Sequence, residues 1–143
     1  MMNVIEIPFV EKVGIQRNTD GELELPFNIG VQNHLETIHA SAQFALAETA
    51  SGEILQKSFS DLEGKVVPVL RESQIKFIKP ANTKIVACPS VSAESLSRFE
   101  EQISEKGRAL ISVDVHLKDI KGQLTCTGTF KWFVQRIETG QMH

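Results

Sequence analysis

Residues 33–52, NHLETIHASAQFALAETASG, constrain the fold of this chain more than any other segment. Residues 38–50 predict a helix with apolar or small side chains on nearly every side. A helix without a polar face is expected to be buried all round. It nevertheless carries Glu48, and burial of a carboxylate is costly unless another group pairs with it. Because perturbed carboxyls collect at functional sites, Glu48 is the first candidate for chemistry.

Strand-like segments occupy much of the remaining chain. Strands are predicted over residues 22–29, 54–59, 66–78, 82–88, 108–118 and 124–134. Apolar side chains occupy every second position of 108–118, from Ala109 to Leu117, and a turn at 119–122 leads into the second alternating run over 124–134. These last two segments predict a long antiparallel hairpin.

Two smaller helices are predicted as well. Pro8 opens an apolar segment that predicts a short helix ending near Gly14. Residues 93–106 carry apolar groups at helical spacing, with Ser92 placed to cap the start and Gly107 the end. This helix is amphipathic and is expected to lie on a surface.

A long antiparallel sheet needs cover on one face, and the apolar helix is the only predicted element that a sheet can wrap. The sequence therefore predicts an α+β fold in which a long, curved antiparallel sheet surrounds a central apolar helix. No repeat, low-complexity tract or linker interrupts the 143 residues. We expect one domain over residues 1–143.

Charge and composition disfavour several classes of partner. The formal net charge is −3 and no Lys/Arg cluster is present, so nucleic acid is not expected as a partner. The N-terminus lacks the pattern of a signal peptide and no apolar run reaches membrane-spanning length, so a cytoplasmic protein without membrane contact is expected. Cys88 and Cys126 lie in apolar, strand-like contexts, which favours buried, reduced thiols.

Several of these residues occur in a familiar arrangement. Asn33 precedes a short loop, His39 opens the central helix, and Glu48 follows a Leu-Ala pair nine positions after the histidine. Residues 76–81, KFIKPA, form a strand end with a Lys-Pro-Ala turn. Together with the predicted architecture, this pattern resembles the hotdog fold and its small acyl-CoA thioesterases related to phenylacetyl-CoA thioesterases. The resemblance covers about residues 7–137.

The resemblance implies hydrolysis of an acyl-CoA thioester, with CoA entering as part of the substrate and without a separate cofactor. The sequence departs from the family at two points. A His-Gly-Gly motif reads His39-Ala40-Ser41 here, and Glu36 stands where the preceding loop normally has glycine. The added Cβ atoms narrow the approach of a carbonyl to the backbone amides. A sister branch of the fold, uncharacterised as enzymes, has similar variants without glycine.

Thioester hydrolysis needs polarisation of the carbonyl oxygen and a carboxylate that acts as nucleophile or general base. The amides of Ala40 and Ser41, at the positive end of the helix dipole, are the predicted oxyanion hole, with His39 bracing the helix start. Glu48 is the predicted catalytic carboxylate, but it lies ~13 Å further along the helix than His39. Glu48 must then act on the thioester bound by a second copy, so a homodimer is predicted. Asn33 either holds the loop or orients the carbonyl or water.

The alternatives for these residues are structural. Glu48 can instead be a paired carboxylate at a dimer interface, and Asn33 can simply close a turn. Gln43 is expected in helix packing or the substrate pocket, while Lys79 is a candidate for the CoA phosphates or for solubility, as are Lys84 and Arg71. A dimer of dimers is also compatible with the sequence.

Three other functions compete with hydrolysis. A non-catalytic hotdog dimer that binds acyl groups, or serves only in assembly, is favoured by Ala40 and Ser41. A dehydratase is suggested by His34, fourteen residues before Glu48, but the prolines and glycine expected around such a pair are absent. A metal site is not expected, because His34, His39, His116 and His143 show no paired ligand spacing.

Overall fold

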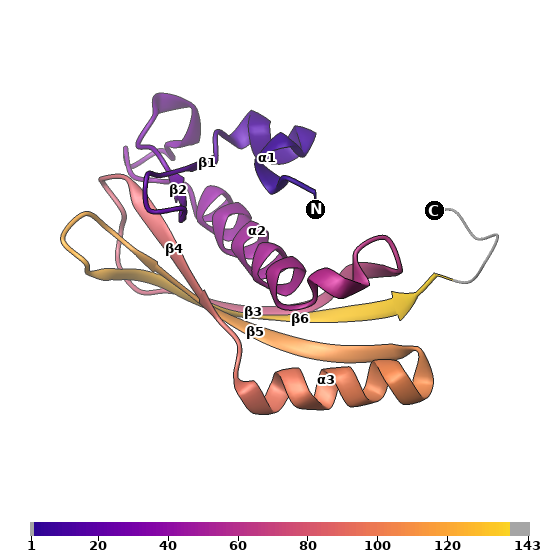
Figure 1. Cartoon of the computed structure of the whole chain (residues 1–143). Helices are drawn as coiled ribbons and strands as arrows, with labels where there is room; N and C mark the ends of the chain where they lie inside the picture. Colours follow the sequence, from indigo (N-terminus) through magenta and orange to yellow (C-terminus); the bar gives the residue numbers. More distant parts are fainter. Residues whose placement is uncertain (1, 138–143) are drawn as a thin grey trace.

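The computed structural model describes residues 2–137, which form one six-stranded antiparallel sheet around a central helix (Figure 1). The strand order is β1-β2-β4-β5-β6-β3. The strands are β1 (Gln16–Arg17), β2 (Leu23–Leu25), β3 (Val66–Phe77), β4 (Ile85–Ser90), β5 (Arg108–Lys118) and β6 (Leu124–Arg136). The α-helices are α1 (Pro8–Val13), α2 (Ala40–Ser58) and α3 (Ala93–Lys106), with short 3-10 turns η1 (Val4–Glu6), η2 (Ile29–Val31) and η3 (Ser60–Leu62).

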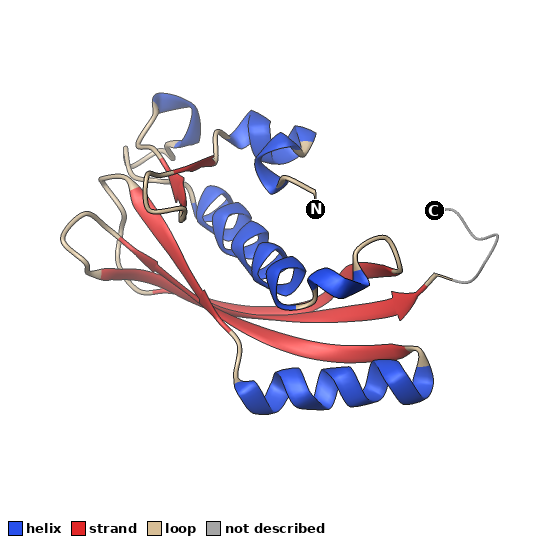
Figure 2. Cartoon of the chain, in the orientation of Figure 1, coloured by secondary structure: helices blue, strands red, loops and turns tan. Residues whose placement is uncertain are grey.

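The hairpin of β5 and β6 is the framework of the sheet and confirms the predicted pairing. Asp114 faces Thr129 across the two strands, and the pairing continues over nearly their full length. Buried and exposed residues alternate along β5, as the sequence pattern predicts. The sheet curves around α2, which lies on its concave side (Figure 2). The predicted α+β architecture is therefore confirmed.

Helix α2 begins at Ala40, two residues after its predicted start, and extends eight residues past its predicted end. Its predicted end was residue 50, and the strand predicted over 54–59 is wrong because most of this segment is helical. Gly52 does not end the helix. A Cβ at Gly52 would lie 3.3 Å from the Trp132 ring of β6, so the glycine allows the indole to pack directly on the helix.

Strand β2 is shorter than the predicted strand over 22–29. Pairing stops at Leu25, because Pro26 has no N–H to donate and the chain then turns through a hydrogen bond from Asn28 N to Pro26 O, 3.0 Å. Ile29, predicted on the apolar face, is 88% exposed. The strand predicted over 82–88 is shifted and extends through Pro89 to Ser90.

The two smaller helices agree with the predictions. In α1 the chain leaves the helix at Gly14, which has a φ of +93°. Helix α3 is capped by Ser92, whose Oγ accepts a hydrogen bond from Ser95 N, and ends at Gly107 with a φ of +72°. It runs alongside β5 (Figure 1), where β4 no longer pairs with that strand. Phe99 of α3 contacts Phe59 at a centroid distance of 4.1 Å.

Both cysteines are free, with Cys126 buried and Cys88 half-buried. Burial raises the pKa of the Cys126 thiol to about 11. Within residues 2–137, no helix is both long and apolar enough to span a membrane.

Candidate active site

One side of α2 is open rather than packed against the sheet. The cavity beside it has a volume of about 1170 Å³. Its walls come from α2, the N-terminal segment, strands β3 and β6, and the connection that follows α2. Helix α2 contributes a stripe at helical spacing that includes Ser41, Phe44, Glu48, Gly52 and Leu55. The apolar helix is thus not buried all round in a single chain, and its open stripe faces a predominantly apolar groove.

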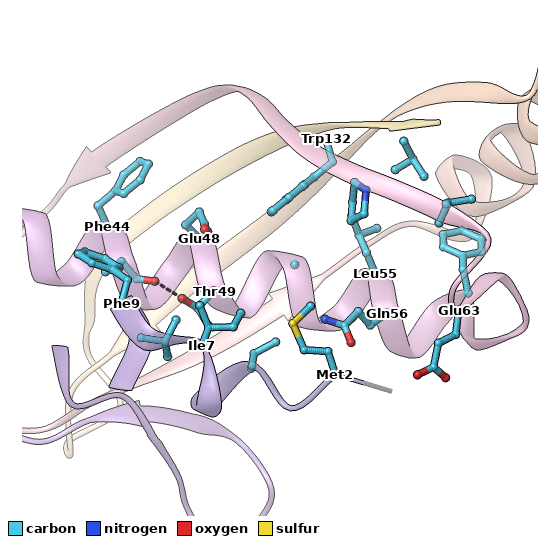
Figure 3. A pocket seen from close by; sticks show the side chains of 18 of the residues that line it. Met2, Ile7, Phe9, Phe44, Glu48, Thr49, Leu55, Gln56, Glu63 and Trp132 are labelled. Carbon is cyan, nitrogen blue, oxygen red and sulfur yellow. Dashed lines mark hydrogen bonds between the residues drawn. The ribbon is translucent and has the colours of Figure 1, made fainter. Parts of the chain in front are cut away.

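Glu48 lies in the middle of this stripe. Its side chain is on the same side of the helix as Phe44 and near Trp132, while Phe9 and Met2 approach from the N-terminal segment (Figure 3). Among the described residues, the Glu48 carboxylate has no hydrogen-bond or ion-pair partner. Burial raises its pKa above the ordinary value for glutamate. Glu48 therefore combines partial burial with freedom to act on another molecule.

The start of α2 is exposed and lies at one end of the same groove. His39 is the N-cap residue, and its Nδ1 accepts a hydrogen bond from Ser41 N at 2.9 Å. Ser41 N–H is therefore occupied by the histidine ring. Ala40 N–H has no acceptor within residues 2–137 and remains available to a bound group.

Asn33 organises the loop that leads to this helix. Its Oδ1 accepts hydrogen bonds from Leu35 N at 2.9 Å and Thr37 N at 3.1 Å, and its Nδ2 donates to Thr37 Oγ1 at 2.9 Å. These contacts close the turn, which was one of the two roles expected for Asn33. Glu36, where the family has glycine, is the one non-glycine residue with positive φ in the described chain, at +59°.

Two other candidate residues lie away from the groove lining. Gln43 is 4% exposed, and its Oε1 accepts a hydrogen bond from Thr125 Oγ1 at 3.1 Å, so it packs between α2 and β6. Lys79 contacts Gln123 and lies 3.5 Å from Asp119 Oδ2. The turn containing Lys79 is nevertheless next to the helix start, because Ile38 N donates to Ala81 O at 2.8 Å.

The remaining basic candidates have partners within the chain. Lys84 Nζ lies 3.4 Å from the buried Glu24 Oε1, and the Arg71 guanidinium lies 4.2 Å from the centroid of the Phe133 ring. In the described part of the chain, no group of three His, Cys, Asp or Glu side chains is positioned to hold a metal. His143 lies outside the described residues.

Sequence reasoning did not identify Trp132 and Ser51 as parts of the site. Trp132 Nε1 donates to Ser51 Oγ at 2.9 Å, and Ser51 Oγ donates to Glu48 O at 2.7 Å. The indole is thus linked to the helix turn that carries Glu48. The signal in the sequence was a single tryptophan on the inward face of a strand, together with a glycine inside a helix.

Solved structures share this architecture. A Pseudomonas aeruginosa protein named a probable thioesterase is 25% identical, with a TM-score of 0.81 over 94% of this chain and 91% of its own. A Bacillus halodurans protein crystallised with CoA is 26% identical, with a TM-score of 0.68 over 88% of this chain and 74% of its own. A Haemophilus influenzae thioesterase, 18% identical with a TM-score of 0.74 over 96% and 90% of the two chains, shares the fold.

These likenesses and the sheet wrapped around α2 define a protein of the hotdog-fold superfamily. Residues 4–134 match the family described as a domain of unknown function, DUF4442, and the chain belongs to that family. No curated protein matches the sequence.

Proposed function

We propose that this protein hydrolyses acyl-CoA thioesters at a site shared by two copies of the chain. The observation that carries the proposal is that one apolar groove holds both the Glu48 carboxylate and the Ala40 amide at a helix N-terminus, and that neither group has a partner within residues 2–137. The probable thioesterase from Pseudomonas aeruginosa and the CoA complex from Bacillus halodurans support this class of substrate.

The reaction adds water to the thioester carbonyl and releases a carboxylic acid and the CoA thiol. Ala40 N–H and the positive end of the α2 dipole stabilise negative charge on the carbonyl oxygen. Glu48 removes a proton from the attacking water, or attacks the carbonyl carbon itself to give an anhydride that water then hydrolyses. Asn33 and His39 hold the loop and the helix start, and thereby orient the Ala40 amide.

Distance along α2 requires the second copy. Eight residues separate Ala40 from Glu48, which places them ~12 Å apart along the helix axis. One thioester carbonyl cannot contact both groups of the same helix. We infer that strand β3, an edge strand of the sheet, pairs with β3 of a second copy and brings each Glu48 to the other copy's helix start.

Hydrolysis of a panel of acyl-CoAs, followed by release of free thiol, tests this proposal. Glu48→Gln is expected to lower kcat by roughly 10²- to 10⁴-fold while the dimer persists in size-exclusion chromatography. Asn33→Ala is expected to reduce activity by loosening the loop. Glu105→Gln, an exposed carboxylate of α3, is the matched control and should leave the rate unchanged.

A non-catalytic acyl-binding dimer is the competing function, and the Cβ atoms of Ala40 and Ser41 favour it. If the wild-type protein binds acyl-CoAs but releases no thiol from any of them, this alternative replaces hydrolysis. Equal rates for wild type and Glu48→Gln would remove Glu48 from the mechanism.

A further inference from the structure

We infer that the groove beside α2 takes a saturated, medium- to long-chain acyl group, and that the contact between Trp132 and Gly52 sets the bore through which the chain passes. This inference rests on the proposed function, since it names the acyl class for that same site. The hydrolysis proposal depends on Glu48 and the start of α2. This inference depends instead on the part of the groove beyond Glu48, where we place no catalytic group.

The length of the groove favours a long chain over a short one. Its lining continues from Glu48 along α2 to the C-cap residue Phe59, eleven residues or ~16 Å at the helical rise. A saturated chain with C–C bonds of ~1.5 Å and bond angles of ~111° advances ~1.25 Å per bond, so about 13 bonds fit along this segment. An acetyl group would leave most of it unfilled.

The chemistry of the walls favours an aliphatic chain. Beyond Glu48 most of the groove lining is apolar and includes Leu55, Phe59, Phe99, Val66 and Trp132, beside the polar residues Gln56, Ser60 and Glu63. Phe59 and Phe99 are almost fully buried and pack on each other, so they form an aromatic wall in this part of the groove. Transfer of methylene groups from water into such a space is favourable, by an amount proportional to the area buried.

The Trp132 ring packs on Gly52, one helical turn beyond Glu48 and before Phe59. Its position is fixed twice, by the hydrogen bond from Nε1 to Ser51 Oγ at 2.9 Å and by close packing on Gly52. Any side chain at position 52 meets the indole, because even a Cβ would lie 3.3 Å from the ring. A large residue there must fill the groove or displace the ring.

The experiment uses Trp132 as its own reporter, because it is the single tryptophan of the chain. Saturated fatty acids from butyrate to stearate, below their micelle concentrations, are titrated while the tryptophan emission is recorded. We expect binding to tighten by up to ~4-fold per added methylene and then to level off as the chain reaches Phe59. The hydrolysis rates of the matching acyl-CoAs should follow the same trend in kcat/KM.

Gly52→Leu narrows the bore at the Trp132 ring, one helical turn beyond Glu48. It is expected to abolish the gain from longer chains while short-chain binding and hydrolysis persist. Gly30→Leu is the matched control, because Gly30 lies in η2 with no atom within 4 Å of an added Cβ and outside the groove. This variant should keep the wild-type dependence on chain length. If Gly52→Leu does not fold, the wild-type titration decides alone.

The two proposals fail in different ways. Suppose that only short-chain acyl-CoAs release thiol and that no fatty acid changes the tryptophan emission. This result would overturn the proposal that the groove binds a long acyl chain, but it would not contradict hydrolysis. Side chains of a second copy would then fill this part of the groove. If the tryptophan emission changes with chain length but no acyl-CoA releases thiol, the groove binds a long acyl chain and the hydrolysis proposal is overturned.

Discussion

The two sides of α2 differ in what they require of their residues. On the side that faces the sheet, Leu46, Ala47 and Ser51 have no exposed surface. On the groove side, Ser41 is exposed and Glu48 is half-buried without a partner among the described residues. The same helix is thus closely packed along one stripe and open along the other.

This difference separates residues that hold the fold from residues available for chemistry. Gly52 in a helix interior costs ~1 kcal/mol relative to alanine, and desolvation disfavours the charged form of Glu48. Both unfavourable features lie on the groove side. The residues that lower the stability of the folded state thus lie on one stripe of α2, and the opposite stripe of small and apolar residues is fully packed. This distribution is expected where a site has to bind and release another molecule.

After Glu48→Gln, the largest effect is expected for Ala40→Pro on the groove side. Proline removes the free N–H that we assign to the carbonyl oxygen, and it is well tolerated at the first helical position. His39, with φ −59° and ψ 139°, already has the extended backbone that a following proline requires. Activity should fall by ~10²- to 10³-fold with little change in Tm. Unchanged thiol release would exclude this amide from the oxyanion hole.

Substitution of two leucines of α2, one on each side, compares how much each side contributes to the free energy of unfolding. Leu46→Ala should lower the free energy of unfolding by about 3 kcal/mol, because it leaves a void between α2 and the sheet. Leu55→Ala should cost roughly half as much, since its void merges with the existing groove. Denaturant titration with matched m-values measures both. Equal losses would mean that the groove side is as closely packed as the sealed one.

A smaller effect is expected at the helix start. His39→Ala removes the ring that accepts a hydrogen bond from Ser41 N and should cost about 1 kcal/mol, or a Tm decrease of ~3 °C. His39→Asn should restore most of this stability, because asparagine is a strong N-cap. If the asparagine variant is as unstable as the alanine variant, capping is not the role of His39.

The smallest effect is the dependence of stability on pH. Burial raises the pKa of Glu48 in the folded state, so the folded chain binds the Glu48 proton more tightly than the unfolded chain does. Stability contributed by the protonated form is present below the unfolded pKa of ~4.3 and is lost as pH rises through the raised folded value. Because glutamine does not ionise, Glu48→Gln removes this loss of stability at higher pH.

The Tm of Glu48→Gln should therefore exceed that of wild type near neutral pH, and the gap should close toward about pH 4. Thermal unfolding across this range, with Glu105→Gln as control, measures the gap. A difference that does not change with pH would indicate that Glu48 titrates as an exposed carboxyl does.

The sequence predicted those parts of the fold in which local pattern and tertiary packing agree. Helix α3 matches its predicted residues and both caps, and β5 alternates as expected. The errors arise where a distant residue overrides a local signal. Gly52 reads as a helix end, yet Trp132, eighty positions away, packs on it and the helix continues.

The candidate site was predictable in its residue types and less so in its contacts. An ionisable residue in an apolar helix indicated Glu48, and its partial burial and upward pKa shift agree with that signal. Alternation and periodicity do not say whether Gln43 faces the groove or the sheet, since both surroundings accept a polar group with a partner. The involvement of Trp132 depends on the closure of the sheet around α2, which no local pattern encodes.

Mixing two inactive variants tests the shared site most directly. In a heterodimer of Glu48→Gln with Ala40→Pro, an intact Ala40 amide from one copy meets an intact Glu48 from the other at one of the two sites. Random exchange of subunits makes half of the dimers mixed, so the account predicts recovery of about a quarter of wild-type thiol release. If the mixture stays as inactive as either variant after exchange is verified by mass-tagged subunits, the site does not combine these groups from two copies.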